Sequence, residues 1–597
     1  MKLTDYVVNF LSEQGIKYVF GLTGGAVVHL FDSLEKHPNI KPIFNHHEQA
    51  SALAAEAYAR VRNNIGAAFV TTGPGGTNAI TGVLAAWMDS VPCIFISGQA
   101  RIEQTSRGKQ IRQLGSQEFD IVSLITPITK YTAMIDDPQK IKYHLQKAVY
   151  LAKSGRPGPV WIDIPLNIQW SQIDADKLPE YLPKGTNCIT VKDKQLKQCI
   201  DLLSEAKRPL ILAGYGIRLA NAVQEFKIII KKFRIPYVSS WNASDLLPTD
   251  DPLYVGRIGV MGQRGGNLAV QNCDCLLALG SHLSLPLTGT NVKAFAREAK
   301  KIIVDIDPVE LDFQKKFIDL PILSDVKSFL SQFLKKFKEP QKDGLDSWRE
   351  RCLKYKAYNM VQKDWKKPGR YVNPYVFVDL LSDHLTTDDV IVVDGGGTAL
   401  FISFQGSKIK AGQRLIVSAG IAAMGTGLPE SIGACFANKG KRVICMTGDG
   451  SLQFNIQELQ TIVHHRLPIK IFVFNNSGYL AIRHTQRDFL SKRYVGSCKA
   501  GGVSLPDFQK IANAYGIRAI RIYNNKEMHK KVKSALNDSG PVLCEIMISP
   551  DQQLIPRVGF NKNADGTFSS RPLEDMAPYL GRKEFTENMM VKPWDRV

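Results

Sequence analysis

The most constraining feature of the sequence is an alternation of short apolar runs with helix-length patterns, which recurs in three successive segments. Such an alternation is typical of parallel α/β layers. At roughly 100–200 residues per domain, a chain of 597 residues also predicts about three domains. We therefore predict an α/β fold with three doubly wound parallel-sheet domains.

Shifts in composition place the domain boundaries. The first predicted domain covers residues 1–170 and the second covers residues 188–335. Residues 336–370 are charged and contain proline and glycine, which is typical of a linker, here with one helix in it. The third predicted domain covers residues 371–550, and residues 551–597 are expected to form an arm that lies over the body.

Each expected strand is a short apolar run that ends in glycine or polar turn residues. Cys275–Leu279 in the second domain and Ile469–Asn475 in the third are clear cases. The expected strands are Tyr18–Phe20, Lys41–Phe44, Ala67–Thr71, Cys93–Ser97, Pro209–Ala213, Cys275–Leu279, Lys301–Val304, Val390–Asp394, Arg442–Thr447 and Ile469–Asn475.

Composition argues against secreted and membrane classes. Hydrophobic residues make up 44% of the chain and charged residues 22%, as in ordinary globular proteins. The N-terminal stretch MKLTDYVVNFLSEQG lacks the apolar run of a signal peptide, and no stretch of about 18 apolar residues is present. The ten cysteines form no CxxC pair, which favours a reducing compartment. We expect a cytoplasmic protein.

The formal net charge of +20 raises the question of a nucleic-acid partner. Such a partner requires basic residues clustered on one face. The lysines are instead dispersed, apart from short groups such as Lys335–Lys336 and Lys366–Lys367. We therefore predict small-molecule partners, with neither nucleic acid nor membrane, and a positive charge that helps to attract anionic substrates.

One pair of motifs points to chemistry. The run RVICMT leads into Gly448-Asp449-Gly450-Ser451, and the run IKIFVF ends in Asn475-Asn476, 26 residues after Asp449. Two adjacent parallel strands would deliver the acid and the amide to the same sheet edge, where ligands bind in open α/β sheets. A lone Gly-Asp-Gly turn is common, but this strand context makes a functional site the stronger interpretation.

These residues suit a magnesium–diphosphate site. Mg²⁺ prefers hard oxygen ligands, which Asp449, Asn476 and the carbonyl of Gly478 can supply, and it usually shares them with phosphate. The glycines beside Asp449 allow the backbone to approach a diphosphate closely and to donate N–H groups to its oxygens.

The stretch GDGSLQFNIQELQTIVHHRLPIKIFVFNN resembles the thiamine diphosphate motif of the acetolactate synthase-like superfamily. YVFGLTGGAV, HHEQASALAAEAYAR, TTGPGGTNAITGV, WMDSVPCIFISGQ, GRPGPVWIDIP, VDIDP and MGTGLPESIGA resemble the same family in the same order. The resemblance implies pyrimidine-binding, central and diphosphate-binding domains. It also implies a homodimer or homotetramer whose cofactor, thiamine diphosphate with Mg²⁺, lies between the first domain of one subunit and the third domain of another.

Most of the expected site residues follow from this resemblance. Met424 matches the bulky residue that props the cofactor into its bent shape, although a plain core methionine is an equal alternative on physics alone. The expected cofactor-binding residues are Gly24, Gly25, Glu48, Gly395, Gly396, Gly397, Thr398, Met424, Gly448, Asp449, Gly450, Ser451, Asn476, Gly478 and Tyr479.

Glu48 is the expected catalytic acid–base group. In the family, the glutamate of this motif hydrogen-bonds the pyrimidine N1′, and exchange of a proton there helps the cofactor to lose its C2 proton. A site shielded from water would raise the carboxyl pKa and ease that exchange. Taken alone, Glu48 reads as a first-turn helix glutamate favoured by the helix dipole. The adjacent His46 and His47 are interpreted as structural.

The sequence departs from true acetolactate synthases around the substrates. Ser116 stands where they carry phenylalanine, Thr485 where they carry tryptophan, and Thr398-Ala399 where they carry Gln-His. Leu166-Asn167 replaces a Lys-Asp pair, and Ser281–Leu285 replaces the arginine–aspartate run that holds FAD, so whether FAD binds is left open.

Smaller side chains at Ser116 and Thr485 predict an enlarged acceptor pocket. Gln117 is the expected group that orients the acceptor carbonyl, as a second catalytic residue. Arg483 is a further expected substrate residue, because its fixed cation could pair with a phosphate or carboxylate. It would face the pocket with Thr485 if their segment is extended, and point to another side if the segment is helical.

The leading functional hypothesis is a carboligase that removes CO₂ from a 2-oxo acid and transfers the acyl carbanion to a second carbonyl. Pyruvate is the expected donor, and a sugar or another larger molecule is among the candidate acceptors. Pyruvate decarboxylases resemble the chain, but they carry a His-His pair where Leu114–Gln117 lies here. A 2-oxo acid decarboxylase, a C–C hydrolase of a cyclic dione and an inactive binding partner of the same fold are the alternatives.

Overall fold

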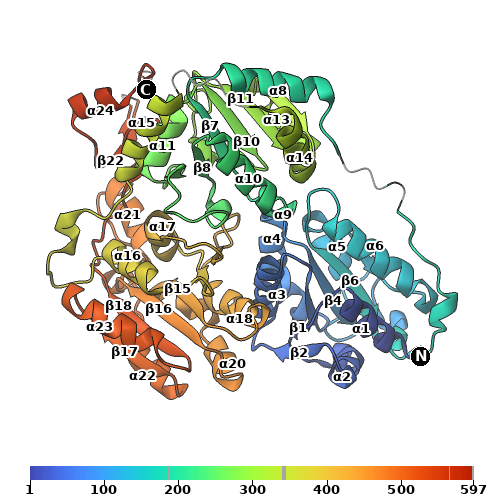
Figure 1. The fold of residues 1–597 in the computed structure, drawn as a ribbon. Coiled ribbons are helices and arrows are strands. Elements are labelled where there is room, and N and C mark those ends of the chain that lie inside the picture. The colour runs from blue at the N-terminus through green and yellow to red at the C-terminus, as the bar shows by residue number, and fades with distance from the viewer. Residues whose placement is uncertain (184, 186–188, 339–344, 564, 595–597) are drawn as a thin grey trace.

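The computed structural model describes residues 1–183, 185, 189–338, 345–563 and 565–594. These residues form three α/β units, each built on a six-stranded sheet. In Figure 1 the N-terminal unit (blue) and the C-terminal unit (orange) lie side by side, and the central unit (green) lies above both. The predicted α/β class with three parallel-sheet domains is confirmed.

The N-terminal sheet has the strand order β2-β1-β3-β4-β6-β5, and all its pairs are parallel. Its inner strands β3 and β4 are buried along their whole length, because helices cover both faces of a parallel sheet. Helices α3 (Glu48–Arg62) and α4 (Pro74–Met88) follow β2 and β3. The strands are β1 (Tyr18–Gly21), β2 (Lys41–Phe44), β3 (Gly66–Val70), β4 (Cys93–Gln99), β5 (Thr132–Met134) and β6 (Val160–Pro165).

The central sheet has the order β12-β11-β10-β7-β8-β9, again with parallel pairs. The predicted strands Pro209–Ala213 and Cys275–Leu279 coincide with β7 and β10. The remaining strands are β8 (Tyr237–Ser239), β9 (Tyr254–Arg257), β11 (Lys300–Asp305) and β12 (Leu320–Leu323).

The C-terminal sheet has the order β14-β13-β15-β16-β18-β17 and is also parallel. Strands β15 and β16 are direct neighbours, with Gly448 in register with Phe474, as the spacing of the two motifs predicted. The strands are β13 (Val390–Val393), β14 (Arg414–Ile416), β15 (Val443–Gly448), β16 (Ile469–Asn475), β17 (Arg518–Ile522) and β18 (Val542–Met547).

The N-terminal and C-terminal units share one hydrophobic core, which passes between α3 and α18 (Gly427–Ala437). The two helices lie side by side in Figure 1 and approach closely at Gly433, where an added Cβ would lie 2.0 Å from the Ala54 carbonyl oxygen. Glycine is required at this crossing because any side chain would push the helices apart.

The segments expected to be linker and arm both pack on the central unit. Helix α15 (Leu345–Ala357) buries Trp348, whose indole N–H donates to the Pro209 carbonyl at 2.9 Å, so this part of the predicted linker belongs to the central core. Residue 188, at a predicted boundary, and residues 339–344 of the predicted linker lie outside the described residues.

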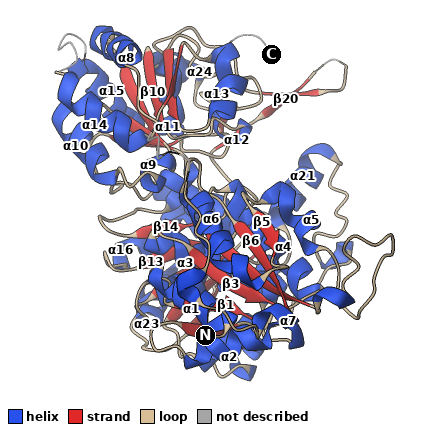
Figure 2. Cartoon of the chain, turned by 90° about the vertical axis from the view of Figure 1, so that its right-hand side faces the viewer, coloured by secondary structure: helices blue, strands red, loops and turns tan. Residues whose placement is uncertain are grey.

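The C-terminal arm follows the central unit to α24 (Arg582–Asn588), and Arg264 donates to the Met576 carbonyl at 3.1 Å. Figure 2 shows the hairpin of β20 (Phe560–Lys562) and β21 (Phe568–Ser570) projecting from the body. A second pair, β19 (Arg557–Val558) with β22 (Met576–Ala577), anchors the base of the arm.

Among the helices of the described residues, none combines the length and the apolarity that a membrane span needs. The nine cysteines in the same residues are unpaired, and all but Cys498 are buried. The buried ones therefore serve as small core side chains.

Candidate functional site

The carboxyl edge of the C-terminal sheet brings Asp449, Asn476 and Gly478 together. Asp449 opens α19 (Asp449–Leu452) directly after β15, and Asn476 follows β16. The Asp449 Oδ2 accepts from the backbone N–H groups of Asn476 and Gly478, each at 3.0 Å, and Oδ1 accepts from Gly450 N–H at 2.9 Å. The acid predicted as a metal ligand is therefore held against both of its predicted co-ligands.

Asp449 is almost fully buried, at 1% exposure. Burial raises its pKa to about 7, while the three N–H donors and the positive Arg483 act in the opposite direction. A nearby divalent cation would favour the charged form, so the site suits a metal. The described residues contain no group of three or more His, Cys, Asp or Glu side chains placed to hold an ion, so a metal here would rest on one carboxylate and neutral oxygens, a set that Mg²⁺ accepts.

A second glycine loop lies against the first. Helix α17 (Gly397–Gly406) begins after Gly396, which has no side-chain cap, so its first N–H groups lack intrahelical partners. An added Cβ at Gly396 would lie 2.0 Å from the Ser451 hydroxyl, and one at Gly450 would lie 2.3 Å from the Tyr479 ring. The two loops therefore form a tight cradle with backbone donors, the arrangement that binds a diphosphate.

Asp394 joins this cradle to the loop that carries Met424. The Asp394 carboxylate accepts from Gly396 N–H at 2.8 Å and from Gly427 N–H at 3.0 Å. Met424 is half-buried three residues before the start of α18, and Gly425 N–H reaches the Asp394 carboxylate at 3.4 Å. The expected cofactor-propping residue thus lies next to the expected diphosphate cradle.

Glu48 lies in the N-terminal unit, as the first residue of α3, with only 6% of its surface exposed. Its Oε2 accepts from the Asn78 side-chain amide on α4 at 3.0 Å. An added Cβ at Gly75 would lie 3.6 Å from the other oxygen, Oε1, and one at Gly24 would touch Thr71. Asn78 was missed from the sequence, because only the packing of α4 beside α3 connects it to Glu48.

The expected substrate residues divide between two units. Ser116 and Gln117 lie on an exposed loop of the N-terminal unit, where the Gln117 carbonyl accepts from the Thr72 hydroxyl at 3.4 Å. Thr485 is exposed on α21 (Leu480–Phe489) of the C-terminal unit. The segment is helical, so Arg483 and Thr485 point to different sides, and Arg483 is buried with its guanidinium bonded to protein oxygens.

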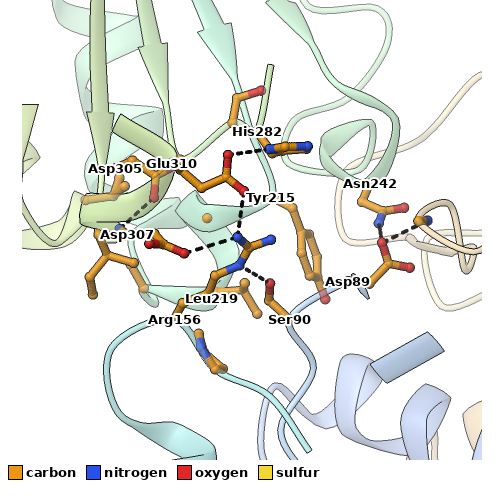
Figure 3. Close-up of a pocket in the computed structure, with 18 of the residues that line it drawn as sticks. Asp89, Ser90, Arg156, Tyr215, Leu219, Asn242, His282, Asp305, Asp307 and Glu310 are labelled. Carbon is orange, nitrogen blue, oxygen red and sulfur yellow. Dashed lines mark hydrogen bonds and ion pairs between the residues drawn. The ribbon is translucent and has the colours of Figure 1, made fainter. Parts of the chain in front are cut away.

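A cavity of about 1260 Å³ opens at the carboxyl edge of the central sheet, where the three units meet. Arg156 of the N-terminal unit reaches into it and contacts Asp307 at 3.3 Å and Glu310 at 3.0 Å (Figure 3). Glu310 also bonds His282 at 2.8 Å, and this hydrogen bond together with Arg156 lowers the pKa of Glu310 to about 2. No sequence pattern predicts this cluster, because it forms only between two units.

Residues of the run that replaces the flavin-holding motif, Ser281 and His282 among them, line this cavity. The neighbouring glycine loop uses its donors internally: Gly214 N–H donates to Leu279 O and Gly216 N–H to Gly280 O, both at 2.9 Å. Arg156 is engaged by two carboxylates as well, so neither it nor these glycine donors are free to bind a flavin diphosphate.

Family models for thiamine pyrophosphate enzymes match all three units. The N-terminal TPP binding domain matches residues 1–124, the central domain residues 196–333, and the C-terminal TPP binding domain residues 394–546. The last range contains the Asp449 cradle and the first contains Glu48.

Curated relatives match along nearly the whole chain. The acetolactate synthase large subunit of Cyanidium caldarium is 33% identical over 93% of this chain and 95% of its own length. A probable acetolactate synthase large subunit of Methanocaldococcus jannaschii is 33% identical over 93% of both chains, and the large subunit of Lactococcus lactis is 32% identical over 94% of this chain and 95% of its own.

Proposed function

The chain belongs to the thiamine pyrophosphate enzymes, among the acetolactate synthase-like carboligases, and from that premise we propose a Mg²⁺-dependent enzyme that joins the acyl group of pyruvate to a carbonyl acceptor larger than pyruvate. The observation that carries the proposal is the convergence of Asp449, Asn476 and Gly478 beside the two glycine loops.

The proposed roles of the C-terminal edge follow from its donors and acceptors. Asp449, Asn476 and the Gly478 carbonyl would hold Mg²⁺, and the first N–H groups of α17 would bind the diphosphate. Thiamine diphosphate supplies the electron sink for loss of CO₂ from a 2-oxo acid and for addition of the acyl carbon to a second carbonyl.

Glu48 is the proposed acid–base residue. Asn78 donates to Oε2 and so fixes the orientation of the carboxyl group, which would leave Oε1 to exchange a proton with the pyrimidine N1′ of a bound cofactor. The buried position excludes water from this exchange.

The proposed acceptor follows from the side chains at two positions. Ser116 and Thr485 are small and exposed where acetolactate synthases carry aromatic residues, which supports an acceptor larger than pyruvate, such as a keto-sugar. Gln117 remains the proposed group that orients the acceptor carbonyl. Arg483 is buried among protein oxygens, which argues against the earlier expectation that it binds an anionic group of the acceptor.

A product assay tests the reaction class. The enzyme with thiamine diphosphate and Mg²⁺ is given pyruvate alone, pyruvate with aldehydes or keto-sugars, and, in a separate reaction, a cyclic dione. The products are identified by mass. We expect little acetolactate from pyruvate alone and a condensed product with a larger acceptor. Efficient acetolactate formation that no acceptor improves would contradict the acceptor proposal. Acetaldehyde as the only product would indicate a decarboxylase, and cleavage of a cyclic dione without CO₂ release would indicate a hydrolase. No turnover would indicate a silent protein.

The Glu48→Gln variant tests the acid–base role. Glutamine keeps the size and the contact with Asn78 but cannot pass a proton, so turnover should fall by roughly 10²–10⁴-fold while cofactor affinity is kept. Turnover close to that of the unaltered enzyme would refute the role.

We further propose that each site lies between the N-terminal unit of one copy and the C-terminal unit of another. Mixing Glu48→Gln chains with Asp449→Ala chains, each inactive alone, should then restore part of the activity, because one site of a mixed dimer combines two intact halves. Light scattering measures the assembly in the same samples. If mixed dimers form and stay inactive, the Glu48 half and the Asp449 half of each site belong to one chain.

A further inference from the structure

Arg483 lies in the first turn of α21, and its side chain points back beneath the loop that carries Asn476 and Gly478. Only 7% of its surface is exposed. Its Nη2 donates to Asn476 O at 2.9 Å, to Asn476 Oδ1 at 2.8 Å and to Pro550 O at 2.9 Å. Its Nη1 donates to Ser497 O at 3.2 Å and to Ser477 O at 3.4 Å. One cation therefore ties together three chain segments.

The contact with the Asn476 side chain has a chemical consequence. A guanidinium is only a donor, so it fixes the amide oxygen on its own side and leaves the amide nitrogen to approach Asp449 Oδ1, at 3.4 Å. The amide oxygen keeps a second lone pair for another partner. Because Gly478 sits at φ +143°, and an added Cβ would lie 2.8 Å from Arg483 Nη1, the loop is held in a shape that only glycine permits.

We propose that Arg483 is a positioning residue that presents Asn476 and the Gly478 carbonyl to the metal–diphosphate group and makes no contact with the acceptor. The inference rests on the proposed magnesium and thiamine diphosphate site at this loop. Groups that orient metal ligands typically change metal affinity or activity by roughly 10–100-fold when they are removed.

The variants are Arg483→Gln and Arg483→Lys, with Arg487→Gln as the matched control. Arg487 lies one turn further along α21, is partly exposed and pairs with Asp488 at 2.7 Å, so its loss removes the same charge from the same helix without touching the loop. Calorimetry without substrate measures the affinity for thiamine diphosphate over a series of Mg²⁺ concentrations, and steady-state kinetics at saturating cofactor measure the KM of the acceptor.

For Arg483→Gln we expect cofactor affinity to fall roughly 10–100-fold with a higher Mg²⁺ requirement, and the acceptor KM to stay within about twofold. Arg483→Lys should recover part of the affinity, because an ammonium keeps the charge but not the planar fork of donors. It also serves if the glutamine variant does not fold. Arg487→Gln should bind cofactor normally.

Three results would overturn the inference. The first is unchanged cofactor affinity in both Arg483 variants, and the second is a raised acceptor KM with cofactor binding intact. A change in melting temperature alone, with the Mg²⁺ requirement unaltered, would reduce Arg483 to a structural residue and likewise overturn it. If the unaltered protein binds neither thiamine diphosphate nor Mg²⁺, the proposed function itself fails, which is a separate outcome.

Discussion

The carboxyl edges of the C-terminal and central sheets begin from similar sequence, a buried parallel strand followed by a glycine-containing turn, but they use their donors differently. At the C-terminal edge, the first N–H groups of α17 have no partner within the helix. At the central edge, Gly214 and Gly216 donate to Leu279 and Gly280 of the neighbouring strand end. A glycine turn therefore indicates a phosphate site only where its donors remain unused.

The charged side chains of the two edges are also used differently. The Asp449 carboxylate accepts from the backbone N–H groups of Asn476 and Gly478, and Arg483 holds the same loop. Arg156 at the central edge is paired with Asp307 and Glu310 across a domain boundary. In the proposed site, the first edge keeps the first N–H groups of α17 for a ligand, whereas the second edge uses its charged side chains to join two units of the protein.

The largest expected effect separates the acids of the two edges. Asp449→Ala should abolish binding of thiamine diphosphate, because it removes the charged ligand of the proposed Mg²⁺ site. Asp305→Ala, at the end of β11, should leave that binding unchanged. Calorimetry with both variants makes the comparison, and normal cofactor affinity in Asp449→Ala would show that the two edges are not functionally different.

Glycine substitutions at the two edges should have effects of intermediate size, one on stability and the other on cofactor affinity. In Gly214→Ala the new Cβ meets the backbone oxygen of Gly280 at 2.1 Å, so the strands must move and stability should fall by roughly 1–3 kcal/mol. In Gly450→Ala the Cβ meets the Tyr479 ring, which can rotate away, so cofactor affinity should fall more than stability. Denaturant unfolding and cofactor titration of both variants measure the contrast, and the reverse pattern would refute it.

The smallest expected effect concerns the Arg156 cluster. Arg156→Gln should lower the stability by up to about 1 kcal/mol, since the side chain is 36% exposed and solvent screens its ion pairs. The unaltered protein should show no flavin absorption when purified, and added FAD should not raise its melting temperature. Bound flavin, or a clear thermal shift with FAD, would mean that the central edge also keeps donors for a ligand.

The sequence indicates the positions of strands better than it indicates the partners of side chains. Continuous apolar runs such as Ile469–Asn475 predicted buried parallel strands, because both faces of such a sheet are covered. Arg483 shows the limit of this reasoning. Side chains two positions apart on a helix point about 200° away from each other around the helix axis. The direction of Arg483 relative to Thr485 therefore depended on whether the segment was helical. The sequence left that choice open, and the structure places Arg483 inside.

By itself, the sequence determined the three-sheet architecture and the meeting of Asp449 with Asn476, because strand periodicity and the parallel crossover rule act over short stretches of chain. Only the tertiary structure decided that Asn78 orients Glu48 and that Arg483 supports the Asn476 loop. It also decided that Arg156 forms ion pairs at the central edge. These contacts join segments that are distant in sequence. Their partners depend on how whole helices and units pack, which no local pattern encodes.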